Sequence, residues 1–155
     1  LKGMGVDGVL LSNGPGDPAE NIEIIANLRD IAAMGLPVMG ICLGHQLMAL
    51  AMGGKTVKMP YGHRGGNQPV IELDSDRTYV TTQNHGYEVL ADSLDPEIAR
   101  VSHVNANDRT CEGVVYLKAP IFTVQFHPEA CAGPADTAYL FDKFIAMIDT
   151  AKEGK

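Results

Sequence analysis

The sequence predicts an α/β fold, in which an open, mostly parallel sheet is flanked by helices and an antiparallel strand insertion occupies the middle of the chain. Short apolar runs alternate with helical patterns over residues 6–54, as in parallel strands joined by crossover helices. Residues 54–90 instead carry β-branched and aromatic residues in short pieces separated by Gly, Asn, Asp and Pro, which favours antiparallel strands. A chain of 155 residues that is 45% hydrophobic is long enough for one core, so residues 1–155 are predicted to form a single domain.

The first half is predicted from periodicity and from turn residues. The run "VDGVLLS" ends in a Gly/Pro/Asp cluster, which is typical of a buried strand that leads into a turn. Next, apolar residues recur at steps of three and four until Gly35 and Pro37 end the pattern, which predicts an amphipathic helix. The expected elements are strands at 6–12 and 37–41 and helices at 20–34 and 45–52.

The second half is predicted to be mostly strands. Residues 54–90 favour short antiparallel strands and ordered loops. The runs "ARVSHVNAND", "CEGVVYLKA" and "IFTVQFHPE" continue as strands. The segment "PADTAYLFDKFIAMIDTAK" predicts a closing helix whose apolar face includes Leu140, Phe144, Met147 and Ile148.

Composition excludes several classes of partner. The net charge is −7 and no Lys/Arg cluster is present, so we expect neither nucleic acid nor an anionic membrane as partner. The three cysteines lack C-x-x-C spacing, which argues against disulfides or zinc and for a reducing, cytoplasmic location. No apolar run approaches the roughly 18 residues of a membrane span. The first residue is not Met, and we therefore expect the chain to be part of a longer protein.

The segment "GICLG", residues 40–44, places Cys42 between two glycines at a predicted strand-to-helix corner. A nucleophile at such a corner needs small neighbours two positions away on each side. The helix N-terminus favours a thiolate, and the Leu43 N–H can donate to a developing oxyanion. The alternative interpretation is a small buried cysteine without a catalytic role.

The segment "FHPE" supplies a base for this thiol. His127 stands at the end of an apolar strand, where α/β sheets carry functional groups. Glu129 shares a face with it in extended backbone and can orient the imidazole. A metal-binding pair or a surface loop is the alternative when this segment is considered alone.

The segment "SNGPGDP" exposes backbone N–H groups at Gly14 and Gly16, which lets them approach a ligand closely. A phosphate cradle is the rival interpretation, but the G-K-[ST] ending of a P-loop is missing. An ordinary strand-to-helix turn is the other alternative.

Taken together, "SNGPGDP", "GICLGHQLMAL", "QNHGYEV" and "FHPE" resemble the class I glutamine amidotransferases. The stretch "KTVKMPYGHRGGNQPV" resembles one branch, the glutaminase domain of the carbamoyl-phosphate synthase small subunit. The resemblance implies a flavodoxin-like core and hydrolysis of L-glutamine through a cysteine thioester. It also implies delivery of ammonia to a large synthase subunit, in a heterodimer or higher oligomer. ATP and a divalent metal are expected to bind to that large subunit. No cofactor is expected in this domain.

The resemblance assigns roles residue by residue. Cys42 matches the nucleophile, His127 the residue that relays the proton, and Glu129 the residue that orients the histidine. The N–H groups of Leu43 and near Gly14 match the oxyanion hole. The positions that match the glutamine-holding residues are Gly14, Gly16, Leu43, Gln46, Asn84, Gly86 and Tyr87. For Asn84 alone, a turn residue is the alternative.

The chain also departs from the family pattern. The first strands and helix of the family's domain have no counterpart before residue 6, so we expect missing N-terminal strands and an edge strand at 6–12. Cys131 stands where we expect a small residue, either as a second reactive thiol or as a bystander. The histidines at 45, 63, 85 and 103 are not spaced as a metal set, and no metal is predicted. The alternative functions are another branch, serving guanylate or anthranilate synthesis, or a non-catalytic interaction module with the same fold.

Overall fold

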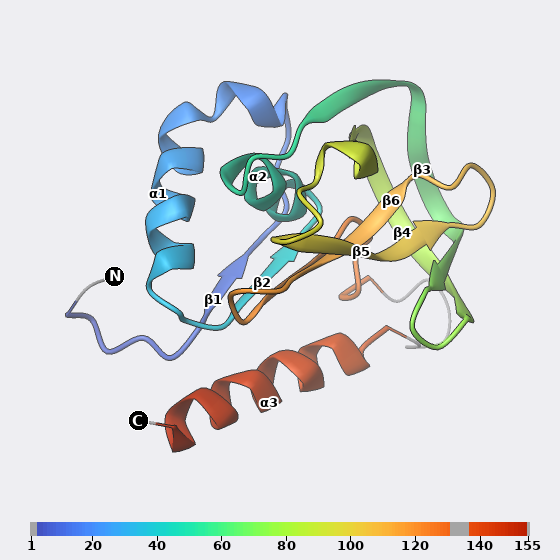
Figure 1. Cartoon of the computed structure of the whole chain (residues 1–155). Coiled ribbons are helices and arrows are strands. Elements are labelled where there is room, and N and C mark those ends of the chain that lie inside the picture. Colours follow the sequence, from blue (N-terminus) through green and yellow to red (C-terminus); the bar gives the residue numbers. More distant parts are fainter. Residues whose placement is uncertain (1–2, 131–136, 155) are drawn as a thin grey trace.

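The computed structural model describes residues 3–130 and 137–154. Helices α1 and α2 lie on one side of the sheet strands β1 and β2, and α3 lies on the other side (Figure 1). The elements are, in chain order, β1 (Val9–Leu11), the 3-10 turn η1 (Pro18–Glu20), α1 (Ile22–Ala33), β2 (Val38–Ile41), α2 (Leu43–Ala51), β3 (Thr56–Glu72), β4 (Arg77–Val89), η2 (Ala91–Ser93), β5 (Ala99–Asn105), β6 (Cys111–Tyr116), β7 (Ile121–Val124) and α3 (Tyr139–Glu153).

The strands form one sheet in the order β1-β2-β7-β6-β4-β3-β5, and β5 also pairs with β6. The α/β class is confirmed, but the prediction of an open, mostly parallel sheet holds only for β1, β2 and β7. The other strand pairs are antiparallel, and β6, β4, β3 and β5 close into a ring. The reason is connectivity. α1 joins the parallel strands β1 and β2, and α2 with the antiparallel insertion joins β2 to β7, whereas short links between successive strands from β3 to β7 permit antiparallel neighbours.

The insertion contains longer strands than the sequence predicted. β3 and β4 have 17 and 13 residues and pair along most of their length. The register shifts between Lys58 and His63 and between Gly65 and Gln68. Gly62 and Gly65 have positive φ angles of 69° and 115°. These glycines therefore bend a continuous strand at bulges and do not end it.

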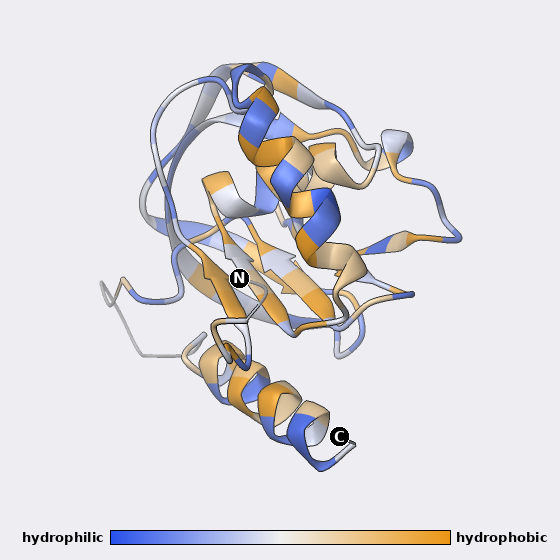
Figure 2. Ribbon diagram, turned by 90° about the vertical axis from the view of Figure 1, so that its left-hand side faces the viewer, coloured by the Kyte–Doolittle hydropathy of each residue, from blue (hydrophilic) through white to orange (hydrophobic). Residues whose placement is uncertain are grey.

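Two apolar cores cover the two faces of the parallel strands. Side chains alternate along β2, so that Val38 packs under α1 and α2 and Met39 packs toward α3. The predicted apolar face of α3 is confirmed, because Leu140 and Phe144 are buried. Figure 2 shows apolar residues concentrated on the strands between the helices. Within the described ranges, no helix has the length and apolarity to cross a membrane.

β1 lies at one end of the sheet and pairs with β2. The strand is shorter than the predicted 6–12, and α3 crosses next to Gly8. A Cβ on Gly8 would lie 2.8 Å from Cδ1 of Ile148. The edge position agrees with the prediction, and Leu10 in this strand is 49% exposed.

Candidate active site

Cys42 stands at the corner between β2 and α2 with φ 53° and ψ −105°. This backbone conformation costs a non-glycine residue about 1–3 kcal/mol. The flanking glycines are required, as predicted. A Cβ on Gly40 would lie 2.7 Å from Thr123 Cγ2, and a Cβ on Gly44 would lie 2.5 Å from the Leu11 carbonyl oxygen. The sequence therefore forms a nucleophile elbow here.

The environment of the Cys42 thiol favours its protonated form, contrary to the expectation of a stabilised thiolate. Burial raises its pKa to about 11, and the Glu129 carboxylate adds to this effect. The Leu43 N–H and the Gln125 side chain act in the opposite direction. Desolvation outweighs the helix N-terminus because the side chain is only 4% exposed. A base is therefore needed at the moment when the thiol attacks.

His127 follows β7 and is hydrogen-bonded to Glu129. Its Nδ1 lies 2.8 Å from Glu129 Oε1, and the two side chains are 12% and 45% exposed. The backbone N–H of His127 donates to the Thr82 carbonyl at 2.9 Å, which ties this segment to β4. The shared face expected of an H-x-E segment is present, and the contact leaves Nε2 free to accept a proton.

Cys42 and His127 line one cavity of about 840 Å³. Most of the predicted glutamine-holding residues line it too: Gly14, Gly16, Gln46, Asn84, Gly86 and Tyr87. Leu43 and Glu129 do not line it. Leu43 packs against the Gly14 backbone, since a Cβ on Gly14 would lie 2.8 Å from Leu43 Cδ2. The structure thus brings the segments "SNGPGDP", "GICLG" and "FHPE" together with β4 around one cavity.

Gln46 contributes less of its amide to the cavity than the sequence suggested. Its Nε2 donates to the Tyr87 carbonyl and to Gln125 Oε1, both at 2.9 Å. Both amide hydrogens are therefore used within the protein, and only Oε1 remains for a ligand. Sequence reasoning missed Gln125, although it stands two residues before His127. It also missed Lys58 and Arg64, which line the cavity from β3.

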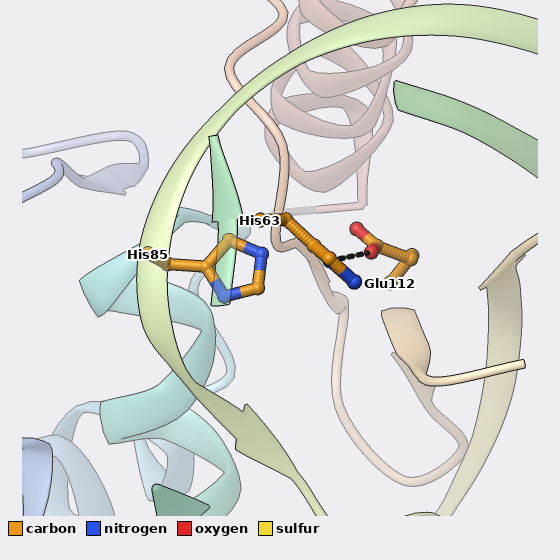
Figure 3. A group of neighbouring side chains, drawn as sticks. All are labelled: His63, His85 and Glu112. Carbon is orange, nitrogen blue, oxygen red and sulfur yellow. Dashed lines mark ion pairs between the residues drawn. The ribbon is translucent and has the colours of Figure 1, made fainter. Parts of the chain in front are cut away.

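A polar cluster joins β3, β4 and β6. His63 and His85 approach Glu112 (Figure 3), and one ligand-type atom from each lies within 4.8 Å of the others. His63 Nδ1 is 3.2 Å from Glu112 Oε1, and its Nε2 is 2.8 Å from Asp108 Oδ2. Glu112 is fully buried. Sequence reasoning did not find this cluster, because Glu112 comes from β6.

The contacts of this cluster favour an ion-pair network over a metal site. The hydrogen bond to Glu112 raises the pKa of His63 to about 9, so its ring is protonated at neutral pH. A protonated nitrogen offers no lone pair to a metal. Gln83 Nε2 also donates to Glu112 at 2.9 Å. The absence of a metal in this domain stays a prediction.

The cluster makes stability depend on pH. Since the folded-state pKa of His63 is above its ordinary 6.5, its contribution is fully present below about pH 6.5 and is lost as the pH rises through about 9. Burial lowers the pKa of His85 to about 4, so its contribution is lost as the pH falls from about 6.5 toward 4. We expect the free energy of unfolding, measured by urea denaturation, to be highest near pH 6.5–7. His63→Gln should flatten the alkaline side, and an unchanged slope in this variant would contradict the assignment.

The other two internal histidines are core residues. Burial lowers the pKa of His45 to about 3 and that of His103 to about 4. Their Nδ1 atoms lie 2.8 Å from Thr123 Oγ1 and 2.9 Å from Ser102 Oγ, respectively. Cys131, the suggested second thiol, lies outside the described residues.

Residues 1–147 match the family Glutamine amidotransferase class-I. Curated relatives named carbamoyl phosphate synthase small chain include those of Symbiobacterium thermophilum, 53% identical over 92% of this chain, and Listeria monocytogenes, 51% identical over all of it. This chain spans 39% and 42% of their respective lengths.

Two solved structures share the fold. A protein from Thermoplasma acidophilum, described as a candidate component of GMP synthase, has a TM-score of 0.82 and 25% identity, over 97% of this chain and 76% of that chain. A glutamine amidotransferase from Thermotoga maritima has a TM-score of 0.65 and 20% identity, over 93% of this chain and 70% of that chain.

Proposed function

Because the chain belongs to the class I glutamine amidotransferases, we propose that it hydrolyses L-glutamine to glutamate and ammonia. The observation that carries this proposal is that the strained Cys42, His127 and glycine backbone all line the same cavity. A thiol, a base and unpaired N–H groups are the parts that an acyl transfer through a thioester requires.

The proposed reaction has two stages. Cys42 Sγ attacks the γ-carbonyl carbon of glutamine while His127 Nε2 takes the thiol proton, and the Glu129 contact to Nδ1 holds the ring. The N–H groups of Leu43 and near Gly14 receive the developing oxyanion. The C–N bond then breaks, the amine leaves as ammonia with the proton from His127, and water hydrolyses the thioester. Each step uses groups of this chain, so no cofactor is proposed for it.

The substrate is proposed to lie along the cavity, with its α-groups toward β4 and the loop after β1. Backbone groups at Gly16 and Gly86, and the side chains of Asn84 and Tyr87, are available there. Gln46 is proposed to contact the substrate through Oε1, since its other amide atom is used. Such convergent polar groups in a cavity determine the orientation of a small ligand.

We further propose that the ammonia passes to a large synthase subunit that makes carbamoyl phosphate in the cytoplasm. The names of the relatives at 51–53% identity support this branch, as does the stretch "GHRGGNQPV". A guanylate or anthranilate branch is the alternative. A non-catalytic module is disfavoured because Cys42, His127 and Glu129 are all present. The net charge of −7 favours a protein partner over nucleic acid.

An ammonia-release assay with glutamine tests the proposal, with the chain alone and with a large subunit of a carbamoyl-phosphate synthase. We expect release that the large subunit increases. Binding of the large subunit without any ammonia release would favour the non-catalytic module. Release that only a guanylate or anthranilate synthase increases would favour another branch.

Replacement of Glu129 should be milder than replacement of His127. We expect His127→Ala to lower kcat by about 10³-fold or more, because the base moves the proton in both stages. Glu129→Ala should lower kcat by about 10- to 100-fold, because an exposed group that orients a base contributes less than the base. Ammonia release under saturating glutamine measures both. Equal losses would mean that Glu129 does more than orient the ring.

A further inference from the structure

Gln125 lies directly beside the nucleophile. Ile41 and Val124 are paired at the ends of β2 and β7, and the Cys42 N–H donates to the Val124 carbonyl at 2.9 Å. Cys42 and Gln125 therefore lie side by side, each directly after the last residue of its strand. The Gln125 side chain is completely buried, and the proposed mechanism has not used it.

The orientation of the Gln125 amide follows from its neighbours. The Tyr87 carbonyl can only accept, so the Gln46 atom at 2.9 Å from it must be the nitrogen. That nitrogen can only donate, so the Gln125 atom at 2.9 Å from it must be the oxygen. The Gln125 nitrogen consequently points the other way.

Gln125 Nε2 has no partner of full hydrogen-bond geometry among the described residues. A buried amide without a partner is destabilising. The amide lies close enough to Cys42 to lower the pKa of its thiol, against the larger effect of burial. A thiol is a weak acceptor, whereas a thiolate is a strong one. A donor beside Sγ therefore interacts more strongly once the thiol has lost its proton.

We propose that Gln125 is a catalytic residue that donates from Nε2 to Cys42 Sγ as the thiol proton moves to His127, and that Gln46 holds the amide in this orientation. The S–H bond breaks, the proton binds His127 Nε2, and the electron pair stays on sulfur. A donor that strengthens only in the charged state stabilises the reacting form over the resting form. This inference rests on the proposed function only in taking Cys42 as the nucleophile.

The test is the alkylation of Cys42 by iodoacetamide, followed by mass spectrometry after brief pH jumps between about pH 8 and 12. Gln125→Met keeps the length and removes the donor. Gln125→Leu also removes the donor and adds no charge next to the thiol. For both variants we expect the midpoint of the pH profile to rise and the rate at pH 8 to fall about tenfold or more, with the same plateau. Gln68→Met, on β3 outside the cavity, is the matched control and should leave the profile unchanged.

A lower plateau with an unchanged midpoint would overturn the proposal, because it would indicate altered access only. An unchanged profile in a folded Gln125 variant would also overturn it. If both variants fail to fold, Gln46→Met tests the same contact, and it should raise the midpoint by releasing the amide. The assay contains no glutamine, so a shifted midpoint supports the role of Gln125 even if the proposed glutaminase activity is absent.

Discussion

Cys42→Ser is expected to lower glutamine hydrolysis by about 10⁴-fold or more while glutamine binding is largely retained. Serine keeps the strained corner and the cavity, but its hydroxyl is a much weaker nucleophile than a thiol. Loss of a nucleophile of this kind removes nearly all the covalent catalysis. Ammonia release measures the activity, isothermal titration measures binding, and mass spectrometry detects the thioester in the unmodified chain.

Cys111→Ser is the matched control. Cys111 is buried in β6, where its Sγ donates to the Gly113 carbonyl at 3.7 Å, and it does not line the cavity. We expect this variant to keep its activity. Labelling of Cys111 in place of Cys42 by a glutamine-analogue electrophile, or normal turnover in Cys42→Ser, would refute the assignment of the nucleophile.

Gly44→Ala is expected to lower both stability and activity. The new Cβ would lie 2.5 Å from the Leu11 carbonyl oxygen and 2.6 Å from Leu11 Cβ, so the backbone of β1 or α2 must move. Overpacking of this kind costs about 1–3 kcal/mol, and occasionally more. A shift of about 1 Å between the elbow and the loop after β1 can lower the rate about 100-fold.

Urea denaturation and ammonia release measure the two effects. Gly154→Ala, at the end of α3, serves as the control because its Cβ would meet Thr150 O at an ordinary 3.7 Å. We expect a change within about 0.5 kcal/mol for this control. A Gly44→Ala variant with unaltered stability and full activity would show that the close approach of Leu11 is not required.

The sequence predicted the elements whose determinants are local. The apolar run and the two glycines around Cys42 predicted β2, the corner and α2. The H-x-E spacing predicted the contact between His127 and Glu129. Such features depend on a few adjacent residues, and a pattern in the sequence is enough to reveal them.

Features that depend on distant pairing were missed. The ring of β3 to β6 could not be predicted because glycines at bulges and glycines at turns give the same local signal. The raised pKa of Cys42 depends on how completely other segments cover it. The partner of Gln125 is Gln46 of helix α2, and that of Glu112 is His63 of β3. Both partners are distant in the sequence, so neither Gln125 nor Glu112 stood out from its neighbours.

The pairing of β2 with β7 also has a kinetic consequence. These strands carry the nucleophile and the base, yet the whole β3 to β6 ring is synthesised between them. Closing so long a loop is entropically unfavourable and tends to occur late in folding. No contiguous fragment on either side of the ring contains both groups. The nucleophile and the base are therefore brought together only after the segment that forms the ring has been synthesised and β7 has paired with β2.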